Sequence, residues 1–112
     1  MTPPEDAVLL RDMLDHARRA SDAIAGRRRP DLDTDHVLAA ALERFIEVVG
    51  EAASKISPAT RESAPEIPWH QVIGMRNRLV HGYASLDHDI VWDVVSGDLP
   101  ALISSVERLL EK

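Results

Sequence analysis

Cysteine is absent from the 112 residues of this chain. Its absence excludes disulfide scaffolds, cysteine-ligated zinc, iron–sulfur clusters and cysteine nucleophiles. The five histidines show no metal-binding spacing, so we expect neither a metal nor a cofactor. The acidic N-terminus lacks the order of a signal peptide, which fits a cytoplasmic protein. No apolar run approaches the roughly 18 residues of a membrane span, so we expect no membrane association.

Aromatic residues and positive charge are also scarce. The aromatic side chains are Phe45, Trp69, Tyr83 and Trp92, which are too few for a platform that stacks several bases. Thirteen Lys and Arg residues face 19 Asp and Glu residues, for a net charge of −6. This balance argues against a general polyanion binder, because non-specific affinity for nucleic acid needs a surplus of basic residues.

Helical periodicity is what the sequence does contain. Apolar residues recur at helical spacing over about 3–25, 33–56, 68–81 and from 87 to the C-terminus, with a short polar helix before residue 64. Residues 96–100 mark a kink or a restart of the last helix. No segment alternates convincingly with period two. The length and this pattern predict a single domain over 1–112, folded as an all-α bundle of four to five helices. The wide apolar stripe of the second helix suggests a dimer partner in addition to a core.

One position of the third expected helix carries a charge where periodicity predicts a core residue. Arg76 lies in the middle of the inward stripe, whereas Arg78 points toward solvent. Burying an unpaired charge is costly. Arg76 is therefore paired with a carboxylate such as that of Glu51, faces a subunit interface, or lines a cleft that receives an anion.

Acidic residues are missing around this arginine. Residues 67 to 86 contain no Asp or Glu, although acids make up 19 of the 112 residues. The same window contains Arg76, Arg78, His70 and His81. Such a window in an acidic protein favours a small anion site, and the alternative is chance in a helix that packs against the core.

Arg76 and His81 together offer a chemistry for RNA. An imidazole titrates near neutral pH and can transfer the proton of a ribose hydroxyl or of a leaving oxygen. A guanidinium can stabilise the charge that grows on the phosphorane. On a continuous helix the two side chains lie about 140° apart, so they share a face only if the helix ends or bends near His81. Alone, this spacing is common by chance.

The segment from Arg76 to Tyr83 resembles the Arg-x4-His-x-Tyr motif of the HEPN superfamily, in particular that of HepT-like toxins. The polar Asn77 after the motif arginine also matches. The resemblance covers most of the chain from about Leu32 onward. The other segments that resemble this subfamily, in its order, are Val49–Ala52, Ile67–Trp69, Ile73–Asn77 and Asp89–Trp92.

This resemblance implies a concrete function. Such proteins are small helical homodimers whose two Arg/His motifs face each other in a cleft at the interface, and they cleave cellular RNA as metal-independent endoribonucleases. Arg76 and His81 would be the catalytic residues. The implied partner is an MntA-like nucleotidyltransferase antitoxin, which transfers AMP from ATP to the motif tyrosine, here Tyr83. The added bulk and negative charge would close the cleft.

Further residues have two interpretations each. Glu51 positions Arg76 or pairs with Lys55 on its own helix. Asn77 binds a phosphate oxygen or caps local backbone, and Arg78 steers RNA or is a solvated surface residue. The run Arg27–Arg29 extends the RNA track or is a solvated loop.

Two other functions compete with the ribonuclease. One is a catalytically silent HEPN module that binds a nucleotide or serves as the partner subunit of a nucleotidyltransferase complex. The other is a structural dimerisation domain, in which Arg76→Met would be harmless or stabilising.

Overall fold

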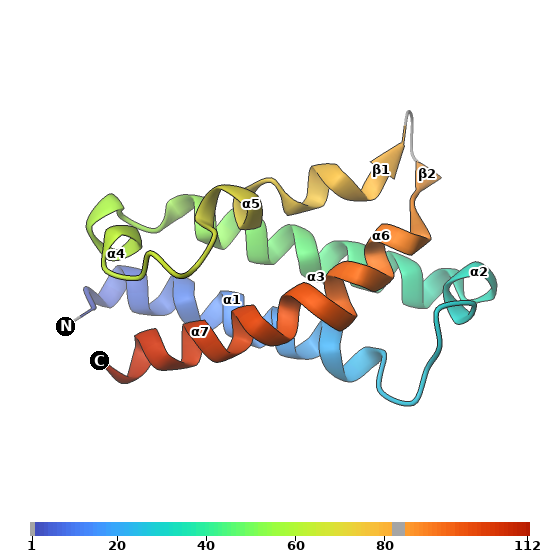
Figure 1. The fold of residues 1–112 in the computed structure, drawn as a ribbon, viewed down its shortest axis with the longest axis horizontal. Coiled ribbons are helices and arrows are strands. Elements are labelled where there is room, and N and C mark those ends of the chain that lie inside the picture. Colours follow the sequence, from blue (N-terminus) through green and yellow to red (C-terminus); the bar gives the residue numbers. More distant parts are fainter. Residues whose placement is uncertain (1, 82–84) are drawn as a thin grey trace.

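The computed structural model describes residues 2–81 and 85–112, without the side chain of His81, so the expected modification site Tyr83 lies outside the described residues. The chain forms a bundle of long helices with shorter segments between them (Figure 1). The elements in chain order are α1 (Pro4–Ala23), α2 (Asp31–Thr34), α3 (His36–Lys55), α4 (Pro58–Glu62), α5 (Trp69–Ile73), η1 (Met75–Leu79), β1 (Val80–His81), β2 (Ser85–Leu86), α6 (His88–Asp93), η2 (Val94–Asp98) and α7 (Leu99–Glu111).

Local sequence explains where the two longest helices begin and end. Proline occupies the first turn of α1, where its missing N–H costs no hydrogen bond. After α1, Gly26 has a φ of 73°, a left-handed conformation that glycine adopts readily. Asp35 caps α3 by accepting a hydrogen bond from the Leu38 backbone N–H at 2.9 Å. This bond and Arg27 hold the pKa of the Asp35 carboxyl below its ordinary value.

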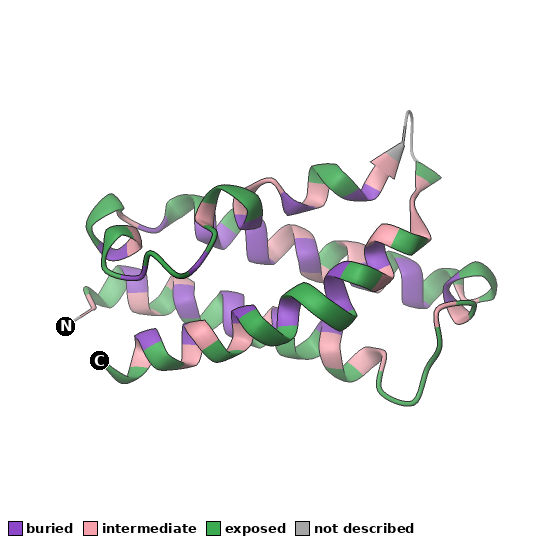
Figure 2. Cartoon of the chain, in the orientation of Figure 1, coloured by how far each residue is buried: buried purple, intermediate pink, exposed green. Residues whose placement is uncertain are grey.

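The bundle encloses one apolar core. Helices α1 and α3 pack along each other, α7 packs on α1, and both termini lie at the same end (Figure 1). Buried residues follow the inward faces of these helices, and exposed residues cover the outside (Figure 2). Side chains with almost no exposure fill the centre: Leu10, Met13, Leu32, Leu42, Ile46, Ile56, Leu79, Leu99, Val49, Val91, Val94 and Val95. None of the described helices combines the length and apolar character needed to cross a membrane.

The all-α bundle is confirmed, but the helix expected over 68–81 is broken. It is an α-helix only over Trp69–Ile73, continues as the 3₁₀ helix η1, and then becomes extended at Val80. Strand β1 pairs antiparallel with β2, and the Asp87 N–H donates to the Leu79 carbonyl at 2.6 Å. A two-residue strand is too short to produce a period-two signal, so periodicity could not reveal it.

The last helix is continuous from α6 to α7, with a π-helical segment, η2, in its middle. This segment spans Val94–Asp98 and overlaps the kink or restart predicted at 96–100. The helix therefore changes its hydrogen-bond pattern across this segment rather than ending there.

A buried carboxylate joins α1 to the turn that begins α4. Asp6 is only 5% exposed. Its oxygens accept hydrogen bonds from the Ser57 and Thr60 hydroxyls, both at 2.6 Å, and from the Ser57 backbone N–H at 3.1 Å. The hydroxyl of Ser57, then that of Thr60, holds the pKa of the Asp6 carboxyl below its ordinary value, although burial opposes the shift.

We predict that Asp6→Ala lowers the free energy of unfolding by about 1–3 kcal/mol at neutral pH, because three donors lose their acceptor. The folded-state pKa of Asp6 is depressed, so its contribution is complete at neutral pH. That contribution decreases as the pH falls below the ordinary carboxyl value of about 3.9 and through the folded-state pKa. Urea unfolding at neutral and acidic pH measures both effects. The exposed Asp12→Ala in the same helix is the control, and an equal loss at both pH values would contradict the assignment.

Candidate functional site

Arg76 lies on η1, which packs against α3. Its Nη2 donates a hydrogen bond to Glu43 Oε2 at 3.4 Å, and its Nε lies 3.8 Å from Glu47 Oε2. Both carboxylates belong to α3, one turn apart on the same face. The sequence left open whether Arg76 pairs with a carboxylate of its own chain. The structure shows such pairing, but the acids are Glu43 and Glu47 rather than Glu51.

The guanidinium of Arg76 is half-buried rather than enclosed. Its side chain is 41% exposed, while its Nε is shielded from solvent and has no hydrogen-bond partner among the described residues. Buried nitrogens of this kind nearly always find a partner. Arg76 thus keeps an exposed edge that an anion can reach, while its inner edge rests on α3.

Glu51 is exposed on α3, and its side chain makes no ion pair with the described residues. It therefore contacts neither Arg76 nor Lys55, the two partners considered for it. The stretch of 67 to 86 is free of acids in sequence, but Glu43 and Glu47 bring two acids to it in space. The surroundings of Arg76 are therefore less positively charged than the sequence of residues 67 to 86 indicates.

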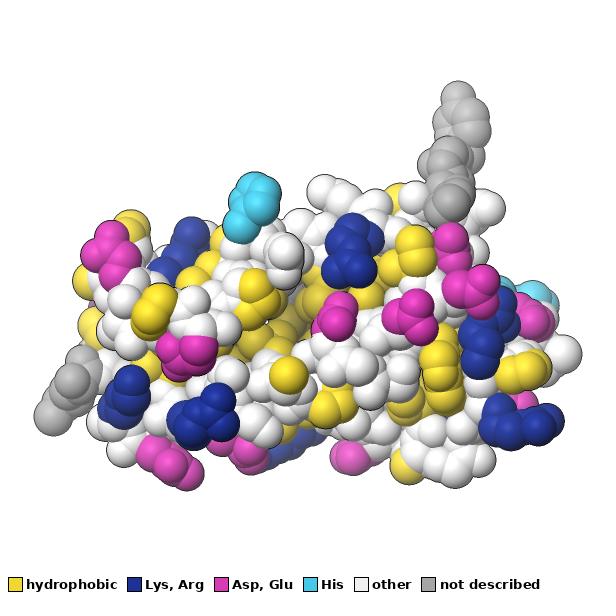
Figure 3. Space-filling view, in the orientation of Figure 1, with side chains coloured by type: hydrophobic (Ala, Val, Ile, Leu, Met, Phe, Trp, Pro, Cys, Tyr) yellow, Lys and Arg dark blue, Asp and Glu magenta, His cyan; other side chains and the backbone are white. Residues whose placement is uncertain are grey.

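Asn77 and Arg78 are both exposed on η1. Arg78 Nη1 lies 3.6 Å from Asp98 Oδ2 of η2, across a groove of about 500 Å³. Val72, Met75 and Leu102 contribute to the apolar lining of this groove, which shows as a hollow between α5–η1 and α7 (Figure 3). Arg78 therefore faces away from α3, on a different side of η1 from Arg76.

The structure describes only the backbone of His81. It lies in β1, opposite Ser85 of β2, and the change from 3₁₀ helix to strand separates it from Arg76. The helical-wheel angle of 140° between them consequently does not apply, since the helix ends before His81. Tyr83 follows outside the described residues.

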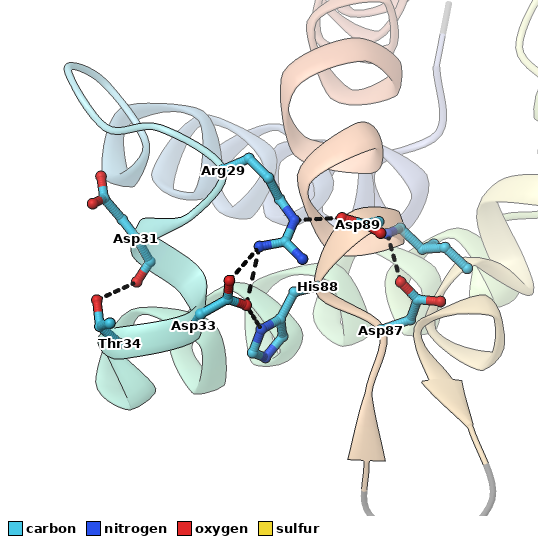
Figure 4. A network of polar contacts seen from close by, with 8 residues as sticks. Arg29, Asp31, Asp33, Thr34, Asp87, His88 and Asp89 are labelled. Atoms are coloured by element: carbon cyan, nitrogen blue, oxygen red, sulfur yellow. Dashed lines mark hydrogen bonds and ion pairs between the residues drawn. The ribbon is translucent and has the colours of Figure 1, made fainter.

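Two of the three arginines in the basic run after α1, Arg27 and Arg29, form ion pairs with neighbouring acids. The Arg29 guanidinium lies between Asp89 at 2.5 Å and Asp33 at 3.0 Å, and Asp33 also contacts the His88 ring at 2.9 Å (Figure 4). The His88 contact, followed by Arg29, holds the pKa of Asp33 below its ordinary value. Arg27 likewise pairs with Asp35. This network joins the α2 region to the start of α6, directly after β2, and offsets the charge of Arg27 and Arg29, whereas the side chain of Arg28 is exposed and forms no ion pair with the described residues.

Among the described residues, no group of three or more histidine or acidic side chains is arranged to hold a metal ion. Within the described site, the partly exposed guanidinium of Arg76 is the group best suited to bind an anion. A family model described as ribonuclease HepT-like matches residues 13–109.

The chain belongs to the HepT-like ribonuclease family. It is 31% identical over 91 residues to a candidate RNase of Caldanaerobacter subterraneus subsp. tengcongensis, covering 81% of both proteins. It is 36% identical over 69 residues to a probable ribonuclease HepT of Thermococcus cleftensis, covering 62% of this chain and 63% of that protein. A candidate RNase of Methanocaldococcus jannaschii is 37% identical over 67 residues, 62% of its length. No solved structure matches the chain significantly.

Gly50 has a positioning role that its motif context alone did not reveal. A Cβ at this position would lie 3.1 Å from the Ile73 carbonyl oxygen and 3.2 Å from that of Val72. Both oxygens belong to backbone that cannot rotate away. Gly50 therefore allows α5 to approach α3 directly before the segment that carries Arg76.

We predict that Gly50→Ala destabilises the protein. The strain of displacing α5 is about 1–3 kcal/mol, which outweighs a gain in helix propensity of at most about 1 kcal/mol. Gly97→Ala is the control, because a Cβ there meets no atom within 4 Å. Thermal unfolding followed by circular dichroism compares them, and a Gly50→Ala variant as stable as the control would contradict the close contact.

Proposed function

We propose that this chain is a metal-independent endoribonuclease toxin that cleaves cellular RNA with Arg76 and His81. The observation that carries the proposal is Arg76 itself. Its guanidinium has an exposed edge and an inner edge held by α3, five positions before a histidine in a chain of a ribonuclease family. Half-exposed, oriented guanidinium groups are suited to phosphate recognition.

The reaction follows from the two side-chain types. The ribose 2′-oxygen attacks the adjacent phosphorus, and the bond from phosphorus to the 5′-oxygen breaks. His81 accepts the proton of the 2′-hydroxyl or donates one to the leaving 5′-oxygen. Arg76 stabilises the extra negative charge on the phosphorane. The products are a 2′,3′-cyclic phosphate and a 5′-hydroxyl.

The proposed active form is a homodimer in which two motifs face each other in a cleft. Two chains would supply two arginines and two histidines, so an Arg76 from one chain and a His81 from the other can meet at one phosphate. Asn77 and Arg78 are exposed on η1 and available to bind flanking RNA.

The proposed regulation is AMP transfer to Tyr83 by an MntA-like nucleotidyltransferase antitoxin. Tyr83 is two residues after His81, so an added AMP places a phosphate and an adenosine beside the catalytic imidazole. That phosphate competes with RNA for Arg76 and its bulk closes the cleft. A silent HEPN module that binds nucleotide or partner without cleaving RNA is the alternative.

We predict that the purified chain cleaves RNA in the presence of EDTA and that His81→Ala abolishes cleavage. Loss of the imidazole removes the proton transfer, a contribution of about 10²–10⁴-fold in rate. His36→Ala, an exposed substitution at the start of α3, should cleave as the unsubstituted chain does. Cleavage that survives His81→Ala contradicts the mechanism. A chain that binds nucleotide but never cleaves supports the silent module instead.

We also predict that incubation with the cognate nucleotidyltransferase and ATP adds AMP to the chain and stops cleavage. Intact-mass measurement should detect the added AMP, and Tyr83→Phe should prevent it because the accepting hydroxyl is missing. A mass increase that persists in Tyr83→Phe would place the modification at another residue.

A further inference from the structure

Two carboxylates of α3 contact Arg76, and neither belongs to the Arg-x4-His motif. We propose that Glu43 and Glu47 are positioning residues for Arg76. They hold its guanidinium against α3 and set how strongly it attracts an RNA phosphate. The proposal rests on the function proposed above, and it assigns to α3 a part in substrate binding.

The distances from the two carboxylates to Arg76 are long enough to leave its guanidinium able to bind a further anion. Glu43 Oε2 is 3.4 Å from Nη2, and Glu47 Oε2 is 3.8 Å from Nε. A tight charge-assisted hydrogen bond would be about 2.7–2.9 Å. Glu47 also accepts a hydrogen bond from Arg44 through its other oxygen at 2.6 Å, which fixes its carboxylate and divides its charge between two arginines.

Burial makes these contacts important for Arg76. Its Nε is shielded from solvent and bonded to no described residue, so the nearby carboxylates must balance the charge on the inner edge. Glu43 is 29% exposed and Glu47 is 32% exposed, so their charges are only partly screened by water. A phosphate that reaches the outer edge of Arg76 is therefore repelled by two acids while it binds an oriented cation.

Glu43 and Glu47 can reach Arg76 because they lie on the face of α3 that packs against η1. Glu43, Glu47 and Gly50 follow one another along the face of α3 that meets α5 and η1. Gly50 sets the distance between the backbones at one end of this face. The glutamates then meet the guanidinium one and two turns earlier in α3.

Two substitutions of Glu43 distinguish the effect of its negative charge from the effect of its hydrogen bond to Arg76. Glu43→Gln keeps a hydrogen-bond acceptor but removes the repulsion, so the KM for a short single-stranded RNA should fall about three- to tenfold with little change in kcat. Glu43→Ala removes both, so kcat should fall about tenfold as Arg76 loses its orientation. Glu62→Gln, an exposed acid on α4, is the control for net charge. Glu43 variants whose KM and kcat both equal those of the control overturn the proposal.

A second measurement tests the contact independently of catalysis. The Nε–H of Arg76 should give an NMR resonance with slow hydrogen exchange, identified by its loss in Arg76→Lys. Glu43→Ala and Glu47→Ala should each shift this resonance and speed its exchange, and an unchanged resonance in both overturns the proposal. If the unsubstituted chain does not cleave RNA, the proposed function fails, and this resonance still decides whether α3 holds Arg76.

Discussion

The approach of α5 to α3 at Gly50 is the constraint on which the candidate site depends. Two backbone carbonyl oxygens of α5 lie only 3.1 and 3.2 Å from where any larger residue would place its Cβ, so the two backbones meet with no side chain between them. The chain then passes into η1 still resting on α3. Arg76 is thereby presented to carboxylates of α3, with one edge covered and the other exposed. Leu79 of the same segment is fully buried in the core and so anchors η1 to the bundle.

Most of the fold was predictable because long helices leave a periodic signal. The apolar stripes gave α1, α3 and the final helix to within a few residues, and the kink or restart expected at 96–100 falls at the π-helical segment η2. The break before His81 was not predictable in this way. Five residues of 3₁₀ helix and two of strand are too few to establish a periodic pattern, and a hydrogen bond between residues eight positions apart, from the Asp87 N–H to the Leu79 carbonyl, stabilises the extended segment.

The site was predicted in part for a related reason. Periodicity predicted Arg76 in the inward stripe of a helix, and the structure has it half-buried on the 3₁₀ helix η1, against α3. Its partners could not be identified from local sequence, since Glu43 and Glu47 are about thirty residues away. The scarcity of acids between 67 and 86 is a fact of the sequence, whereas electrostatics depends on distance in space. Glu43 and Glu47 thus offset the positive charge of Arg76 in space, and the RNA binding proposed there would depend on orientation more than on positive potential.

The mechanism that we propose is cleavage of RNA by Arg76 and His81 through attack of the ribose 2′-oxygen on phosphorus. Analysis of the ends of the RNA fragments that the purified chain produces tests it most directly. This mechanism predicts 2′,3′-cyclic phosphate and 5′-hydroxyl ends, and no cleavage where the ribose before the scissile bond is replaced by 2′-deoxyribose. Fragments with 3′-hydroxyl and 5′-phosphate ends, or cleavage at the 2′-deoxy position, would contradict it.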